Sequence, residues 1–367
     1  MSAIYELLDD YLQEYDRHKS EREFNALNQA SNRLDSAMQE ETLTARLQGL
    51  REATEMSKKL ADRQVSLVFD FYLASELIGS ANDMVEGLKV VRPAAMESRL
   101  VDYDLKSQRI GLNNLLANAY ALVDPLGFGG EIGEVGAIVE ASPLTDNEDL
   151  CVGLAAQYEV QMASGNDAAA RQIRDEIWAH ARILENPLYY LHAAAFDCEL
   201  AFVDEDWQAM VDAASDCMRM ISPTGSYVVM IDDEPVDLEK DADFRVVSAA
   251  HACGLAKLGL GHQIARLQMS NQESGFPAPF HFYGYWIDCH LALGDPVSAT
   301  RLAVESWQEI TGKGQNYREV LVICRLIRCL KIAGRHQEVA DWAQRAREVA
   351  TRLSDPEPML EQVRALL

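Results

Sequence analysis

The sequence predicts an all-α fold built from stacked helix pairs. Apolar residues recur three or four positions apart through most of the 367 residues, which is the spacing of one helix face. Short breaks rich in glycine or aspartate separate these segments, and several pairs end close to a proline. The breaks lie near residues 79, 165, 205, 294 and 334, so their intervals are close to 40 residues or twice that value. A fixed period of this size indicates repeated supersecondary units.

The N-terminal part of the chain is the least repeat-like. Helices are predicted over residues 3–17, 21–38 and 40–61, of which the last two are strongly polar. We therefore expect three regions: an N-terminal helical cap (residues 1–62), the helical repeats (63–356) and a C-terminal capping helix (357–367).

From residue 63 the predicted helices come in pairs. They cover residues 63–77, 84–91, 105–123, 132–139, 147–163, 168–184, 188–203 and 207–221. Pro93, Pro143 and Pro187 are expected to stop second helices, because proline lacks an amide hydrogen and clashes with the preceding turn. The glycine-rich stretch 127–133 resembles a phosphate-binding loop only superficially. It follows a helix and carries no lysine, so we expect a turn between helices.

One insertion, residues 223–243, departs from the helical pattern. Tyr227 to Ile231 form a β-type run, and a turn and an acidic cluster follow. We expect a small β-hairpin or an ordered loop here, and an irregular stretch at residues 270–279. Two clear helix pairs then extend from His281 to Leu353. The predicted architecture is a right-handed superhelix of about seven antiparallel helix pairs with one short β-like insertion.

The turns between paired helices carry a family resemblance. Ala299 and Ala170 follow Gly294 and Gly165 by five residues, and Ala303 provides another small residue four positions later. This pattern resembles tetratricopeptide repeats, especially the longer-helix variants of kinesin light chains and bacterial sensor arms. The family's Trp-Leu-Gly-Tyr signature is absent. The resemblance implies a right-handed α-solenoid whose first helices form a concave, ligand-holding surface.

The composition restricts the classes of partner. The chain has 33 Lys+Arg against 58 Asp+Glu, for a net charge of −25. Such a surface repels nucleic-acid phosphate and anionic lipid and favours a basic protein or peptide. No signal peptide or membrane span is expected from the sequence. Seven cysteines scattered in apolar segments indicate buried, reduced thiols in a cytoplasmic protein.

No pattern typical of a metal site or of catalysis was found. The pairs His251/Cys253 and Cys289/His290 lack the spacing of a zinc site, and the acidic stretch 232–243 lacks the spacing of an EF-hand. The expectation is therefore a non-enzymatic protein without metal or cofactor, with the acidic stretch as a solvated loop.

The candidate binding residues lie on predicted first helices. Arg109/Asn113 and Asn114/Asn118 are spaced i, i+4 along one helix flank, where asparagine is a poor helix former. In the resembled family, basic and asparagine side chains on first helices clamp the C-terminal carboxylate of a peptide. Later helices offer tyrosine, glutamine and histidine instead, and an aromatic run at residues 280–286 lies either in the core or along a groove. The complete candidate set is Arg109, Asn113, Asn114, Asn118, Tyr158, Gln161, Tyr189, His192, Tyr283 and Tyr285.

These observations favour a protein- or peptide-binding scaffold that uses the concave surface of the superhelix. The alternative is a regulatory protein of the same fold that senses a peptide or small molecule. A third reading is a carbohydrate-active enzyme on a closed α-toroid. That enzyme would need paired carboxylates on one rim, from residues 204–206 and 232–234.

Overall fold

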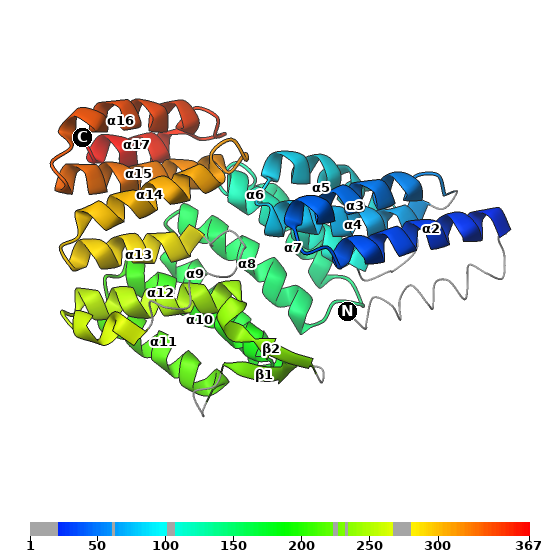
Figure 1. Cartoon of the computed structure of the whole chain (residues 1–367), viewed down its shortest axis with the longest axis horizontal. Helices are drawn as coiled ribbons and strands as arrows, with labels where there is room; N and C mark the ends of the chain where they lie inside the picture. Colours follow the sequence, from blue (N-terminus) through cyan, green and yellow to red (C-terminus); the bar gives the residue numbers. More distant parts are fainter. Residues whose placement is uncertain (1–20, 61–62, 101–106, 223–226, 232–233, 267–279) are drawn as a thin grey trace. The chain divides into compact units, whose positions relative to one another are not determined.

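The structure, a computed structural model, describes residues 21–60, 63–100, 107–222, 227–231, 234–266 and 280–367 (Figure 1). The helix predicted at residues 3–17 and the irregular stretch predicted at 270–279 lie outside these ranges. The chain divides into two compact units, one up to Leu116 and one from Ala117 to Leu367. This division falls within the range predicted for the repeats, and the predicted cap at residues 1–62 stays a prediction.

The first unit is helical throughout its described part. Its elements are α2 (Glu21–Met38), α3 (Leu43–Ser57), α4 (Arg63–Ser75), the π-helix η1 (Glu76–Ser80), α5 (Met84–Ser98), the π-helix η2 (Ser107–Gly111) and the start of α6 (Leu112–Val123). Helices α2 to α5 each pack on the next helix in the chain. Leu27, Leu50 and Phe69 are among the buried side chains between them. Burial of such apolar faces is the main stabilising contribution.

Helix α5 continues through Pro93 to Ser98, so the predicted stop at Pro93 is wrong. The proline side chain is exposed, while Val91, Ala94 and Ala95 are buried. A proline inside a helix removes one hydrogen bond and crowds the preceding turn. Here the packing of the flanking residues outweighs that cost.

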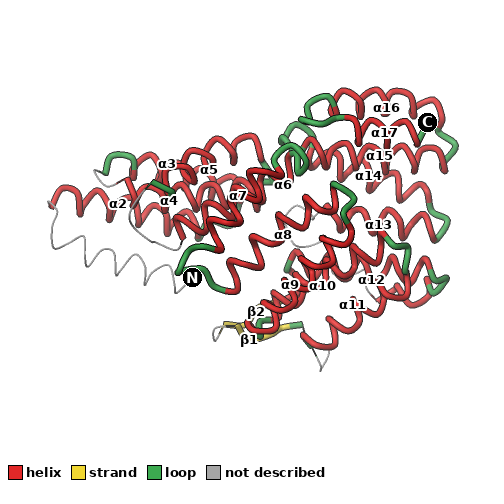
Figure 2. Tube along the Cα trace, turned by 180° about the vertical axis from the view of Figure 1, so that it is seen from behind, coloured by secondary structure: helices red, strands yellow, loops and turns green. Residues whose placement is uncertain are grey.

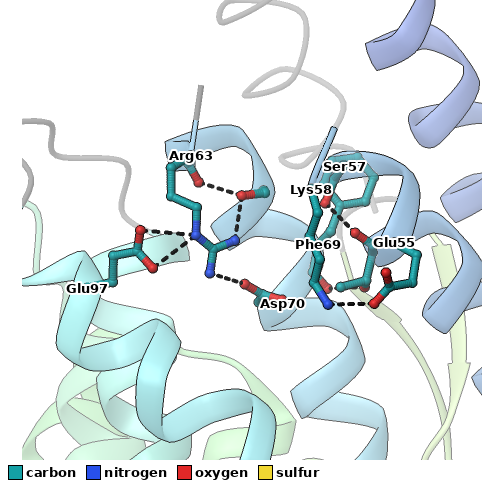
Figure 3. A network of polar contacts seen from close by, with 9 residues as sticks. Glu55, Ser57, Lys58, Arg63, Phe69, Asp70 and Glu97 are labelled. Carbon is teal, nitrogen blue, oxygen red and sulfur yellow. Dashed lines mark hydrogen bonds and ion pairs between the residues drawn. The ribbon is translucent and has the colours of Figure 1, made fainter. Parts of the chain in front are cut away.

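Arg63 joins α4 to α5 through a polar network (Figure 3). Its Nε donates to both carboxylate oxygens of Glu97, at 3.0 and 2.9 Å, and its Nη2 donates to Asp70 at 3.0 Å. Its Nη1 donates to the hydroxyl of Ser66 at 2.6 Å. Burial raises the pKa of Asp70, and the charge of Arg63 opposes that shift. The network compensates for placing a carboxylate inside the unit.

The second unit is also almost entirely helical (Figures 1 and 2). After α6 its helices are α7 (Gly129–Glu140), α8 (Asn147–Ala163), α9 (Asp167–Leu184), α10 (Pro187–Val203), α11 (Trp207–Ile221), α12 (Ala242–Lys257), α13 (Phe280–Ala292), α14 (Pro296–Ile310), α15 (Asn316–Ile332), α16 (His336–Ala350) and α17 (Glu357–Ala365). Two short 3-10 helices, η3 (Leu238–Lys240) and η4 (Gly261–Arg266), flank α12. Helices α7 to α16 pack in chain order, and the predicted all-α fold of sequentially packed pairs is confirmed.

The predicted insertion contains a β-hairpin. Strands β1 (Val228–Ile231) and β2 (Glu234–Asp237) pair antiparallel, with Val228 opposite Asp237 and Ile231 opposite Glu234. This confirms the hairpin reading of the sequence. In the described part of the chain, no helix is both long enough and apolar enough to cross a membrane.

The turns inside the helix pairs share one hydrogen-bond pattern. In each, a backbone N–H donates to the carbonyl five residues earlier at 2.8–2.9 Å: Asn166 to Gln161, Asp206 to Ala201, Leu260 to Leu255, Asp295 to His290 and Arg335 to Leu330. The preceding residue has a positive φ, and it is glycine in four turns and Glu205 in the fifth. This is the hydrogen bonding of a Schellman helix end, for which glycine is preferred. The common geometry explains why glycine recurs at the breaks between paired helices.

Asp124 connects the two ends of the second unit. Its buried carboxylate accepts the N–H of Gly127 at 3.0 Å and that of Ser354 at 2.7 Å. A Cβ on Gly127 would lie 2.3 Å from both the Asp124 carboxylate and the Ser354 hydroxyl. The glycine-rich stretch is thus a turn and the start of α7, as predicted, and it is packed against the C-terminal segment.

We predict that Asp124→Ala lowers the free energy of unfolding by about 2 kcal/mol, because two backbone N–H groups lose a buried, charged acceptor. Urea denaturation measures the change, with the exposed Glu361 of α17 mutated to alanine as the control. Equal stability of the two variants would contradict the assigned role of Asp124.

Candidate functional site: a charged cluster on four first helices

Five ionisable side chains from four helices of the second unit meet in one place. They are Glu159 on α8, Glu199 on α10, His281 on α13, and Arg318 and Arg325 on α15, and we call them the charged cluster. Arg318 Nη2 donates to Glu159 Oε1 at 3.2 Å. The two ring nitrogens of His281 lie 3.7 Å from Glu159 and 3.8 Å from Glu199. Each of these helices is the first of its pair.

The pKa values of the two carboxylates in the charged cluster are shifted in opposite directions. Burial opposes ionisation of Glu159, but His281 and Arg318 outweigh it and lower its pKa to about 2. Burial raises the pKa of Glu199; His281 opposes this shift and the negative charge of Glu159 adds to it. Their side chains retain 22% and 17% of their accessible surface, so neither side chain is completely enclosed. One ionised and one readily protonated carboxylate therefore lie around a single imidazole.

Arg325 is the member of the charged cluster that lacks a counter-ion. Arg318 pairs with Glu159, and Arg328, further along α15, pairs with the buried Asp288. Among the described residues, no group accepts a hydrogen bond from Arg325 or forms an ion pair with it, and its Nη1 is buried. Burial lowers the pKa of Arg325, partly offset by Asp288. An unmatched guanidinium of this kind is uncommon in a folded protein.

Two residues at the start of α13 position Arg325. Its guanidinium lies 4.7 Å from the ring centre of Phe280, within the range of a cation–π contact. A Cβ on Gly284 would lie 2.6 Å from Nη1 and 2.7 Å from Cζ of Arg325. Glycine at this position therefore lets the guanidinium lie directly on α13.

Two of the candidate tyrosines border the charged cluster. Tyr158 is fully buried beside Phe196, with ring centres 4.4 Å apart. Its hydroxyl lies near Glu199 without completing a hydrogen bond in the described structure. Burial and the charge of Glu199 raise the pKa of Tyr158 and of Tyr285, which is also buried. The structure thus brings these two sequence candidates together.

His192 and Tyr283 lie apart from that group and have partners of their own. His192 Nδ1 is 3.0 Å from Asp243, in the first turn of α12. Burial opposes protonation of His192, but Asp243 outweighs it and raises the pKa. The hydroxyl of Tyr283 donates to Glu309 on α14 at 2.6 Å. Both side chains join neighbouring helices.

Two further candidates lie near the ends of helices. Gln161 accepts a hydrogen bond from the side chain of Asn166 at 2.9 Å and so supports the α8–α9 turn. Tyr189 lies in the first turn of α10, partly buried against the core between α8, α9 and α10. Burial and nearby Glu148 raise the pKa of Tyr189.

The asparagine-rich flank lies at the junction of the two units in the sequence. Asn113 is fully buried, accepts from Arg99 Nε at 3.0 Å and donates to the carbonyl of Arg109 at 2.5 Å. Asn114 is also buried, and Asn118 donates to the carbonyl of Val152 on α8 at 3.4 Å. The amide of Asn113 thus contributes to packing within the first unit. Partner binding by this flank stays a prediction.

Glu159, Glu199, Arg318 and Arg325 were not predicted as site residues. Only an isolated charge within an apolar stretch could have indicated them, as for Glu199 between Cys198 and Leu200. Their convergence depends on side chains of α8 and α10 reaching those of α13 and α15, which are not neighbours in the chain. A sequence pattern does not contain that information.

All seven cysteines are buried and unpaired, as predicted. Among the described residues, no group of three or more histidine, cysteine, aspartate or glutamate side chains could hold a metal ion. The sequence matches no protein-family model and no curated protein. The chemistry of the charged cluster is therefore the basis for a functional proposal.

We predict stability changes of opposite sign for two variants. Glu159→Gln lowers the free energy of unfolding at pH 7 by about 2–4 kcal/mol, because Arg318 loses its counter-ion. Glu199→Gln raises it, because the ionised carboxylate is unfavourable in the folded state. The pKa of Glu159 is depressed, so its contribution is present above the unfolded value and lost as the pH falls toward 2. The pKa of Glu199 is raised, so the benefit of its variant disappears below the unfolded value.

Urea denaturation of both variants at pH 7, 5 and 3 measures these effects, with the exposed Glu361→Gln as the control. Changes of the same sign at pH 7 would show that the two carboxylates do not differ as described.

Proposed function

We propose that this chain is a non-catalytic binding protein that holds a protein or peptide on the first helices of its second unit. The observation that carries the proposal is the charged cluster, in which Glu199 and Arg325 have unmet hydrogen-bonding capacity. Polar groups removed from water are normally paired in a folded protein. Groups left unpaired and partly accessible on four convergent helices are suited to recognition of a partner.

The charge of the chain supports a basic partner. The net charge of −25 attracts a cationic segment over a distance set by the salt concentration. Glu199, whose nearest cationic partner is His281 at 3.8 Å, offers its carboxylate to a lysine or an N-terminal ammonium group. The resemblance to tetratricopeptide repeats also favours the first helices as the binding surface, because that family binds peptides there.

The opposite pKa shifts of Glu159 and Glu199 favour one second candidate, a hydrolase that uses a carboxylate pair. Of the rim carboxylates expected for such an enzyme, Asp204 pairs with Arg171 at 2.5 Å at the surface, outside the charged cluster. Asp232 and Asp233 lie outside the described residues. In such a hydrolase, Glu159 and Glu199 would act as the pair of catalytic carboxylates. Hydrolysis of a chromogenic glycoside that is abolished by Glu159→Gln would favour this candidate over the scaffold.

We predict that peptides selected from a random library against the purified chain are enriched in lysine and arginine. Fluorescence anisotropy should show about tenfold weaker binding to Glu199→Gln, since a charged hydrogen bond contributes about 1.5 kcal/mol. Affinity should also fall with added salt.

The matched control is Arg335→Gln, which changes a half-exposed arginine paired with Glu338 outside the charged cluster. Selected peptides that bind wild type and Glu199→Gln equally would place the binding surface elsewhere. A failure to select any peptide would contradict the scaffold proposal.

A further inference from the structure

Glu199 and Arg325 carry opposite charges in the same cluster, yet they form no ion pair with each other. His281, which lies 3.8 Å from Glu199, and Gly284, which contacts Arg325, are three residues apart on α13. Three residues of helix span about 4.5 Å. The carboxylate and the guanidinium therefore flank the same turn of α13.

The neighbouring carboxylates Glu159 and Asp288 each form ion pairs with basic side chains. Glu159 has Arg318, while Asp288 has both Arg328 and Lys257. Beyond these pairs, Glu199 has His281 at 3.8 Å, which is longer than a hydrogen bond, and no described group accepts a hydrogen bond from Arg325. Removing an unpaired charge from water is costly, so a ligand that supplies both missing partners would bind with a large electrostatic gain.

We propose that Glu199 and Arg325 bind a free α-amino acid, with its ammonium group on Glu199 and its carboxylate on Arg325. This inference rests on the proposed binding role of the first helices and names the chemical class of the ligand. Two charge-assisted hydrogen bonds of about 2.8 Å each, with the ligand between them, would join two side chains that do not pair with each other directly.

A ligand with a single charge fits this site less well. A plain anion would satisfy Arg325 but would approach the carboxylates of Glu159 and Glu199. A plain cation would satisfy Glu199 but would approach Arg318 and Arg325. A zwitterion avoids both repulsions and leaves the net charge of the site unchanged.

Isothermal titration calorimetry of the full chain with each proteinogenic amino acid tests the proposal. At least one should bind with a Kd of roughly 1 mM or tighter. Its N-acetyl derivative and its methyl ester should each bind about tenfold more weakly, because each loses one charged hydrogen bond. Loss of affinity on only one of these changes would overturn the two-point arrangement, as would the absence of binding by all the amino acids.

Three variants locate the site. Glu199→Gln and Arg325→Gln should each weaken binding about tenfold. Gly284→Ala retains both charges, but its Cβ would lie 2.6 Å from Arg325 Nη1 and displace the guanidinium, so it should weaken binding as well. Alanine also favours the helix, so α13 should remain folded. Arg335→Gln, which lies outside the charged cluster, should bind like wild type.

Unchanged amino-acid binding in the three variants would overturn the proposal. Selected peptides that still require Glu199 would then leave the proposed scaffold function intact. If the wild-type chain bound neither the amino acids nor any selected peptide, both proposals would be contradicted.

Discussion

The ion pair between Arg318 and Glu159 is the contact on which the charged cluster depends. It joins α15 to α8, whose paired residues are 159 positions apart. In a simple helical-repeat protein each unit contacts only its neighbours. This pair adds a long-range contact, and the hydrogen bond from Ser354 to Asp124, across 230 positions, adds a second. The charged cluster exists because these contacts bring distant first helices together.

We propose that such a cluster contributes more to recognition than to stability. Desolvation offsets most of the attraction within a buried ion pair, and apolar residues of similar size often stabilise a core as well. The Arg318–Glu159 pair is compensated, and Glu199 has His281 at 3.8 Å, but Arg325 has no counter-ion among the described residues. In the proposed function, a ligand would offset the cost of this unmatched charge. The regular helix pairs would then provide the scaffold, and the side chains that they bring together would provide the binding chemistry.

The sequence contained most of the fold but little of the site. The turn residues Gly165, Gly294 and Gly334 predicted the breaks between helices because a left-handed conformation restricts residue choice locally. The helix end predicted at Pro93 was wrong because tertiary packing of the flanking residues outweighs the tendency of proline to end a helix. Glu159 and Arg318 could not be paired from the sequence, since their contact depends on how several helix pairs stack and not on any local pattern.

A double-mutant cycle on Glu159 and Arg318 tests the central claim most directly. The free energy of unfolding at pH 7 is measured for wild type, Glu159→Gln, Arg318→Gln and the double variant. The structure predicts a coupling energy of about 1–3 kcal/mol, since contacting charged residues are not independent. Additive effects would contradict the contact between α8 and α15, and with it the charged cluster.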